Sequence, residues 1–84
     1  MTNEELIEKL KIIVKPYVKN EEGFNSMNEH TDFLNDLKIN SANLVDVILD
    51  VENEFDIIID NDSMEKMLNV KAAMEIINAK LAEK

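Results

Sequence analysis

The chain has 84 residues, no cysteine, and a formal net charge of −9 from 18 acidic residues and nine lysines. This length predicts a single domain spanning residues 1–84, and the lack of cysteine excludes disulfides, thiolate metal sites and thiol nucleophiles. The acidic balance argues against nucleic acid as a partner, and no apolar stretch is long enough for a signal sequence or a membrane span. We therefore expect a cytoplasmic protein that binds neither nucleic acid nor membrane.

The N-terminal segment has the pattern of an amphipathic helix. Thr2 and Glu5 form a T-x-x-E capping box, which predicts a helix start near Asn3. Pro16 lacks a backbone donor, so the helix should end near Lys15 or continue with a kink. The apolar residues that share one face of this helix are Leu6, Leu10, Ile13 and Tyr17.

Residues 20–40 show no sustained period and contain the only glycine, Gly23. We expect a long loop here. An apolar group near its end, Phe33, Leu34 and Leu37, should pin the loop to the core.

From Ser41 to Phe55 the apolar residues recur at helical spacing, which predicts a second and central helix. Its N-cap should be Asn40 or Ser41, because either side chain can accept a hydrogen bond from a free amide of the first turn. Val45 and Leu49 lie away from the main stripe and are either ordinary exposed residues or part of a contact surface for a partner. The residues of the stripe are Leu44, Val47, Ile48, Val51 and Phe55.

Residues 57–59 are three isoleucines with no second strand to pair with, so we expect an extended connection in which alternate residues turn inward. Asp60, or either of the two residues after it, can cap a short helix that runs to about Met67. Asn69 can cap the last helix. The apolar face of that helix holds Val70, Ala73, Met74, Ile77 and Leu81. The predicted fold is an all-α four-helix bundle with a long first loop and a short third helix.

Acidic residues dominate the segment between Lys38 and Lys66, with no base among them. Their field could steer a basic partner, or they could form a solvated face that keeps a small protein soluble. These residues are Asp46, Asp50, Glu52, Glu54, Asp56, Asp60, Asp62 and Glu65.

Ser41, where the loop turns into the central helix, is the main candidate site. A helix start exposes unpaired N–H groups and the positive end of the macrodipole, so a group linked through a phosphate would be stabilised there. Serine hydrolase chemistry is not expected, because the only histidine, His30, has no triad context. No metal site is expected either, because the acids after Asp56 lack the spacing and the central glycine of an EF-hand.

Met64, Met67 and Met74, with Leu68, are flexible apolar side chains that we expect near the central helix. They are either core filler or the lining of a pliable cleft that admits an apolar chain of variable length.

The segment from Phe33 to Ile77 carries a set of motifs around Ser41. Phe33, Asp36 and Leu37 form a Phe-x-x-Asp-Leu approach to the serine, and the helix VDVILDVENEF ends in acidic residues. The run NVKAAMEII then begins with a capping asparagine and continues with valine and paired alanines. In these features the chain resembles the acyl carrier protein family.

The resemblance implies a bundle that catalyses nothing and holds acyl intermediates as thioesters on a 4'-phosphopantetheine arm, taken from coenzyme A and joined to Ser41. A phosphopantetheinyl transferase would modify Ser41, and acyl-loading and chain-extending enzymes with basic docking patches would meet the acidic central helix of a monomeric carrier. The implied partner-docking residues are Asn40, Ala42, Val45, Asp46, Leu49, Asp50 and Glu52. The residues of a possible acyl cleft are Leu44, Ile48, Ile59, Met64, Met67 and Leu68.

Some positions depart from the family pattern. Asn40 and Ala42 stand where the family usually has aspartate and leucine, and Lys38 stands where it has a glycine. Ile58 occupies a position that is usually polar in the family. We interpret these departures as signs of a specialised carrier in a fatty-acid or polyketide-type pathway. Two alternatives are an unmodified acidic adaptor that docks to basic partners and a carrier of aminoacyl or peptidyl groups on the same arm.

Overall fold

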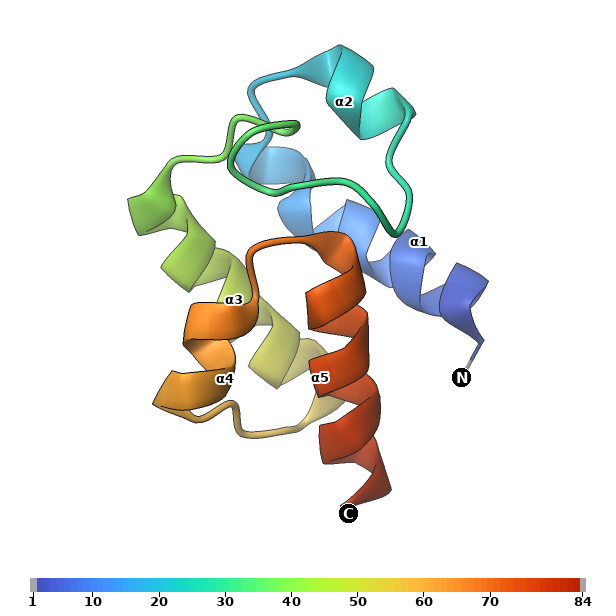
Figure 1. Cartoon of the computed structure of the whole chain (residues 1–84), viewed down its shortest axis with the longest axis vertical. Coiled ribbons are helices and arrows are strands. Elements are labelled where there is room, and N and C mark those ends of the chain that lie inside the picture. Colours follow the sequence, from blue (N-terminus) through green and yellow to red (C-terminus); the bar gives the residue numbers. More distant parts are fainter. Residues whose placement is uncertain (1, 84) are drawn as a thin grey trace.

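The computed structural model describes residues 2–83, which form five α-helices and one 3-10 turn but no β-strand (Figure 1). The elements are α1 (Asn3–Val14), η1 (Lys15–Tyr17), α2 (Glu21–Asn25), α3 (Ser41–Phe55), α4 (Asn61–Lys66) and α5 (Val70–Ala82). α1 packs against both α3 and α5, and α4 lies beside α5. The predicted all-α class, the long segment before the central helix and the short helix after it are confirmed. Among the described helices, none is long and apolar enough to cross a membrane.

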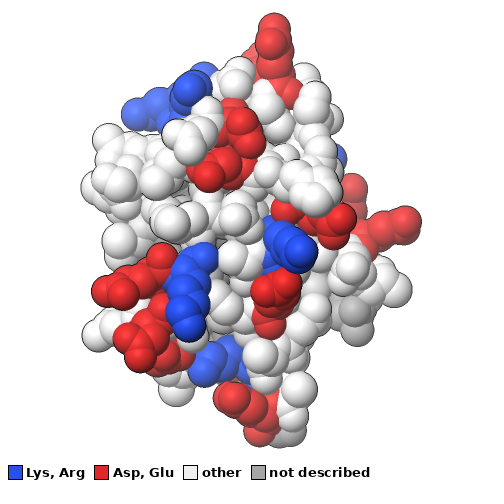
Figure 2. All heavy atoms as spheres, in the orientation of Figure 1, with Lys and Arg blue, Asp and Glu red and all other residues white. Residues whose placement is uncertain are grey.

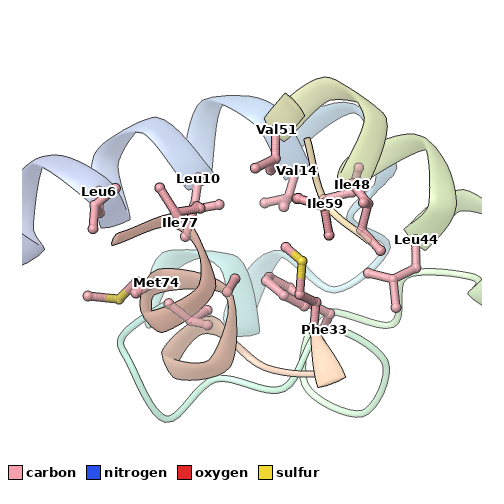
Figure 3. Close-up of a cluster of buried hydrophobic side chains, with 14 of the residues drawn as sticks. Leu6, Leu10, Val14, Phe33, Leu44, Ile48, Val51, Ile59, Met74 and Ile77 are labelled. Carbon is pink, nitrogen blue, oxygen red and sulfur yellow. The ribbon is translucent and has the colours of Figure 1, made fainter. Parts of the chain in front are cut away.

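Side chains from α1, α3 and α5 meet in one hydrophobic core (Figure 3). The whole predicted stripe of the central helix is buried. In α1, Leu6 and Leu10 are buried, while Ile13 is partly buried and packs against the core, as does Tyr17 at the end of η1. The burial of these faces is what orients α3 and leaves its opposite side to solvent.

The ends of α1 lie where the sequence predicts them. Thr2 Oγ1 accepts a hydrogen bond from the backbone N–H of Glu5 at 3.2 Å, which confirms the cap. The α-helix ends at Val14, and Pro16 lies within the 3-10 turn that follows. Proline cannot supply the N–H that a further α-helical turn requires, so the backbone changes its hydrogen-bonding pattern there.

The prediction of an uninterrupted loop over residues 20–40 was wrong at residues 21–25, which form α2. The Asn20 side chain donates to the backbone carbonyl of Asp36 at 2.8 Å. Gly23 lies so close to the same carbonyl that a Cβ atom there would collide with it, and Phe24 packs against the core. Contacts with residues distant in sequence thus hold this short helix, which has no apolar period of its own.

The rest of this segment is pinned to the core, as the apolar residues near its end predict, and is also hydrogen-bonded to the chain around the start of α5. Phe33 and Leu37 are buried, and Leu34 packs against the core. The Phe33 N–H donates to the Leu68 carbonyl at 3.1 Å, and the Val70 N–H donates to a carbonyl of the loop at 2.9 Å. These bonds fix the path of the chain into α3.

The connection between α3 and α4 is extended, as predicted. Ile57 and Ile59 are buried, whereas the Ile58 side chain between them is 83% exposed. The Ile57 N–H donates to the backbone carbonyl of Glu52 at 3.1 Å, and the Ile59 N–H donates to the Glu52 carboxylate at 2.8 Å. One glutamate therefore supplies the acceptors for two residues of a segment that has no partner strand.

Candidate functional site

Ser41 is the first residue of the 15-residue helix α3 and is exposed. The start of this helix lies at the edge of the fold in the view of Figure 1. Asn40 is the N-cap, because its Oδ1 accepts from the N–H of Ala42 at 2.8 Å and its carbonyl accepts from the N–H of Leu44 at 2.9 Å. Asn40 is one of the two caps predicted from the sequence. Burial of Leu44 anchors the first turn, so the serine is held on a fixed helix end rather than on a mobile loop.

The start of α3 favours negative charge. The first turn contains no acidic residue, and Lys38 is exposed in the loop just before it. Among residues 2–83, the N–H groups of Ser41 and Asn43 have no acceptor. Unpaired N–H groups and the positive end of the helix dipole stabilise an anion, so this site fits a phosphate group. Figure 2 shows no charged side chain over the start of α3 on this face, whereas acidic and basic side chains gather over α4.

Lys38 adopts a backbone conformation that favours glycine. Its φ is 57°, in the left-handed region that costs a residue with a Cβ atom about 1 kcal/mol or more. A glycine, which has no Cβ atom, would adopt this conformation without strain. The lysine adds a positive charge near Ser41 at a conformational cost.

Four of the predicted docking residues share the open side of α3. Ala42 and Asp46 are exposed, and the side chains of Val45 and Leu49 are 46% and 47% exposed. Their spacing along the helix puts them on one face, on the side away from the core. The structure thus brings two half-exposed apolar side chains and one carboxylate together on the helix that begins with Ser41.

Two other predicted docking acids are already bonded within the chain. Tyr17 OH donates to the Asp50 carboxylate at 3.1 Å, and this hydrogen bond, together with partial burial, raises the pKa of Tyr17. The Glu52 carboxylate accepts from the Ile59 N–H at 2.8 Å. The sequence pattern did not identify these roles, because each depends on a partner outside the helix. Asp46 is exposed, and its side chain is bonded to no described residue.

The six predicted acyl-cleft residues divide into two groups. Leu68 is 45% exposed, and Met64 is partly buried and packs against the core. The other four are fully part of the core: Leu44, Ile48, Ile59 and Met67. Packing within the bundle accounts for their burial, and an acyl cleft stays a prediction.

A second polar cluster lies at the start of α4, on the same side of the view in Figure 1 as the start of α3 but nearer the C-terminal end of the molecule. Asp60 caps α4 by accepting from the N–H of Ser63 at 3.4 Å and from its hydroxyl at 2.7 Å. Lys80 on α5 forms an ion pair with the same carboxylate at 3.1 Å. Hydrogen bonds from the Ser63 hydroxyl and from Lys80 hold the pKa of Asp60 well below its usual range. In return, the Asp60 carboxylate raises the pKa of Lys80.

His30 lies exposed in the long loop, with its Nε2 at 3.5 Å from a carboxylate oxygen of Glu29. In the part of the chain that the structure describes, no group of three or more histidine, cysteine, aspartate or glutamate residues is arranged to hold a metal ion.

Curated proteins from three bacteria match the chain over nearly its full length. The chain is 34% identical to the acyl carrier protein of Lactobacillus acidophilus, over 94% of this chain and 96% of that protein. It is 32% identical to the acyl carrier protein of Petrotoga mobilis, over 96% and 93%, and 33% identical to that of Coprothermobacter proteolyticus, over 100% of both. No protein-family model matches.

The fold and the site together define a small all-α bundle with an exposed serine at the start of its central helix. The full-length matches agree with that description. The chain belongs to the acyl carrier protein family.

Proposed function

We propose that the chain acts as one carrier domain that holds acyl groups on a 4'-phosphopantetheine arm joined to Ser41 through a phosphodiester. The observation that carries the proposal is the exposed hydroxyl of Ser41 on a helix start with unpaired N–H groups and no acid in the first turn. When bound, the arm supplies the terminal thiol that carries the acyl group as a thioester. The cysteine-free chain has no thiol of its own.

The chain's own residues hold and present the arm in this proposal. The buried face of α3 fixes the helix, the N–H groups of its first turn stabilise the phosphate, and Ser41 Oγ is the atom of attachment. The Ser41 hydroxyl has no hydrogen-bond partner among residues 2–83, so a phosphopantetheinyl transferase would supply the base that activates it, with coenzyme A as donor. The protein itself is not an enzyme.

The open side of α3 is the proposed docking surface for the transferase and for acyl-loading and chain-extending enzymes. Its exposed carboxylate, Asp46, complements a basic patch, and Val45 and Leu49 offer apolar contacts beside it. Asn40 and Ala42, next to the serine, support a specialised fatty-acid or polyketide-type pathway. We place this monomeric carrier in the cytoplasm.

Intact-mass measurement tests the attachment site. After incubation with coenzyme A and a broad-specificity transferase, we expect wild type to gain the mass of one phosphopantetheine group and Ser41→Ala to gain none. Ser63→Ala is the matched control, because Ser63 also lies in the first turn of a helix but its hydroxyl is bonded to Asp60. An unchanged wild-type mass with several transferases, or equal modification of Ser41→Ala, contradicts the proposal.

A second candidate function is an unmodified acidic adaptor, favoured by the two exposed apolar residues on α3 and by the neutral residues that flank Ser41. An adaptor forms a partner complex that survives Ser41→Ala and weakens with added salt. A carrier of aminoacyl or peptidyl groups would use the same arm, and the mass of the loaded arm distinguishes it from an acyl carrier.

A further inference from the structure

The N-cap of α3 is the side-chain amide of Asn40, whose oxygen forms a hydrogen bond within residues 2–83 and whose nitrogen does not. Asn40 Oδ1 accepts from the Ala42 N–H at 2.8 Å, which fixes the plane of the amide at the helix start. Its Nδ2 carries two hydrogens and donates to no residue among 2–83, and the side chain is exposed. A donor is therefore held next to Ser41 without a partner in the chain.

We propose that this Asn40 amide donates a hydrogen bond to the phosphodiester on Ser41, so that Asn40 both caps α3 and binds the arm. The inference rests on the proposed function. A hydrogen bond from a neutral donor to an ionised acceptor is stronger than one between neutral groups, and no acid in the first turn competes for the amide. Asn40 is thus a positioning residue for the phosphate end of the arm.

The residue type at position 40 decides whether this bond exists. An aspartate could cap the helix equally well, but its carboxylate offers only acceptors and would repel the phosphate. A serine could also cap the helix and is neutral, but it lacks the amide group. These two residues separate the roles of Asn40, because both keep the cap and neither keeps the amide donor: an ionised aspartate has no donor, and the one hydrogen of serine lies on the same oxygen that accepts the cap bond.

The experiment compares the apo and arm-loaded forms of wild type, Asn40→Ser and Asn40→Asp by thermal unfolding. The arm should raise the Tm of wild type, because it places an anion at a helix start. In Asn40→Ser this rise should be smaller by about 3 °C, as expected for loss of one exposed hydrogen bond in a domain of this size. In Asn40→Asp it should be smaller by at least as much. The phosphorus NMR shift of the phosphodiester should also differ between wild type and Asn40→Ser.

Asn53→Ser is the matched control, since Asn53 is an exposed asparagine on the same helix, far along it from Ser41. It should keep the full rise in Tm and the wild-type phosphorus shift. An equal rise in Tm for wild type and Asn40→Ser overturns the inference. This holds even if the rise is smaller in Asn40→Asp, because that result would show only that the aspartate repels the phosphate. A wild-type chain that no transferase modifies overturns the proposed function instead.

Discussion

The starts of α3 and α4 use the same chemistry in opposite ways. Each helix has a polar N-cap and a serine in its first turn, Asn40 with Ser41 and Asp60 with Ser63. At α4 the cap is an acid whose oxygens are taken up by the serine hydroxyl and by Lys80. At α3 the cap is neutral and the serine hydroxyl is exposed. A helix start can bind a ligand only where its N–H groups and polar side chains are not already bonded within the chain.

Charge compensation shows the same contrast. The Asp60 carboxylate compensates the positive end of the α4 dipole and also forms an ion pair with Lys80 of α5. The positive end of the α3 dipole meets no acid of the first turn. The difference explains why two serines in similar local settings are assigned different roles.

Removal of the two caps should have the largest effect on stability. Asn40→Ala removes one acceptor of a backbone N–H, which typically costs about 1 kcal/mol and lowers Tm by about 4–8 °C in a domain of this size. Asp60→Ala should lower Tm further, because Asp60 accepts from a backbone N–H, a hydroxyl and a lysine. Circular dichroism during heating measures both changes.

Lys80→Met is the matched variant for this comparison. It keeps most of the side-chain stem and removes the ion pair to Asp60, together with the longer one to Glu83 at 3.9 Å, so its Tm should fall between those of wild type and Asp60→Ala. If Asn40→Ala lowers Tm as much as Asp60→Ala, then the additional bonds of Asp60 at the start of α4 do not add to stability, which contradicts the contrast drawn between the two helix starts.

A smaller effect is expected in the loop that leads to α3. Lys38→Gly should raise the free energy of unfolding by about 0.5–1 kcal/mol, because relief of the left-handed strain exceeds the entropy that glycine adds to the unfolded chain. Urea unfolding measures the change. Lys38→Ala removes the same charge but keeps the Cβ atom, so it should not reproduce the gain. Equal stabilisation by both variants would assign the effect to the charge.

The smallest effect concerns pH. Because the folded-state pKa of Asp60 lies below its ordinary value of 3.8, its contribution to stability is complete above pH 3.8 and declines as pH falls below it. The Tm difference between wild type and Asp60→Asn should therefore be constant between about pH 5 and pH 8 and shrink under more acidic conditions. The difference caused by Asn40→Ala should not follow this curve, because a carboxamide does not titrate. A difference for Asp60→Asn that persists unchanged in acid contradicts the assignment.

The parts of the fold that follow from local pattern were predictable. Helical spacing identified α3 and its buried stripe, the capping box identified the start of α1, and the alternation around Ile58 followed from an extended backbone. The cap of α3 was narrowed to two residues, of which the structure has Asn40 as the N-cap. In each case the responsible residues lie within a few positions of one another.

The features that escaped prediction depend on residues far apart in the chain. α2 is held by the approach of Gly23 to Asp36, and a solitary glycine in a polar segment was the one local sign of it. The hydrogen bond from Tyr17 to Asp50 joins two elements whose relative position no periodicity reveals. Because of it, an acid that reads as a free docking charge turns out to be committed to the bundle.

The bond from Glu52 to the Ile59 N–H has a mechanical consequence. It holds the connection after α3 against the end of that helix, so the connection is not a free linker. The next residue, Asp60, is the N-cap of α4. The Asp60 carboxylate in turn holds the start of α4 to Lys80 of α5, so two successive carboxylates tie this part of the chain to two different helices.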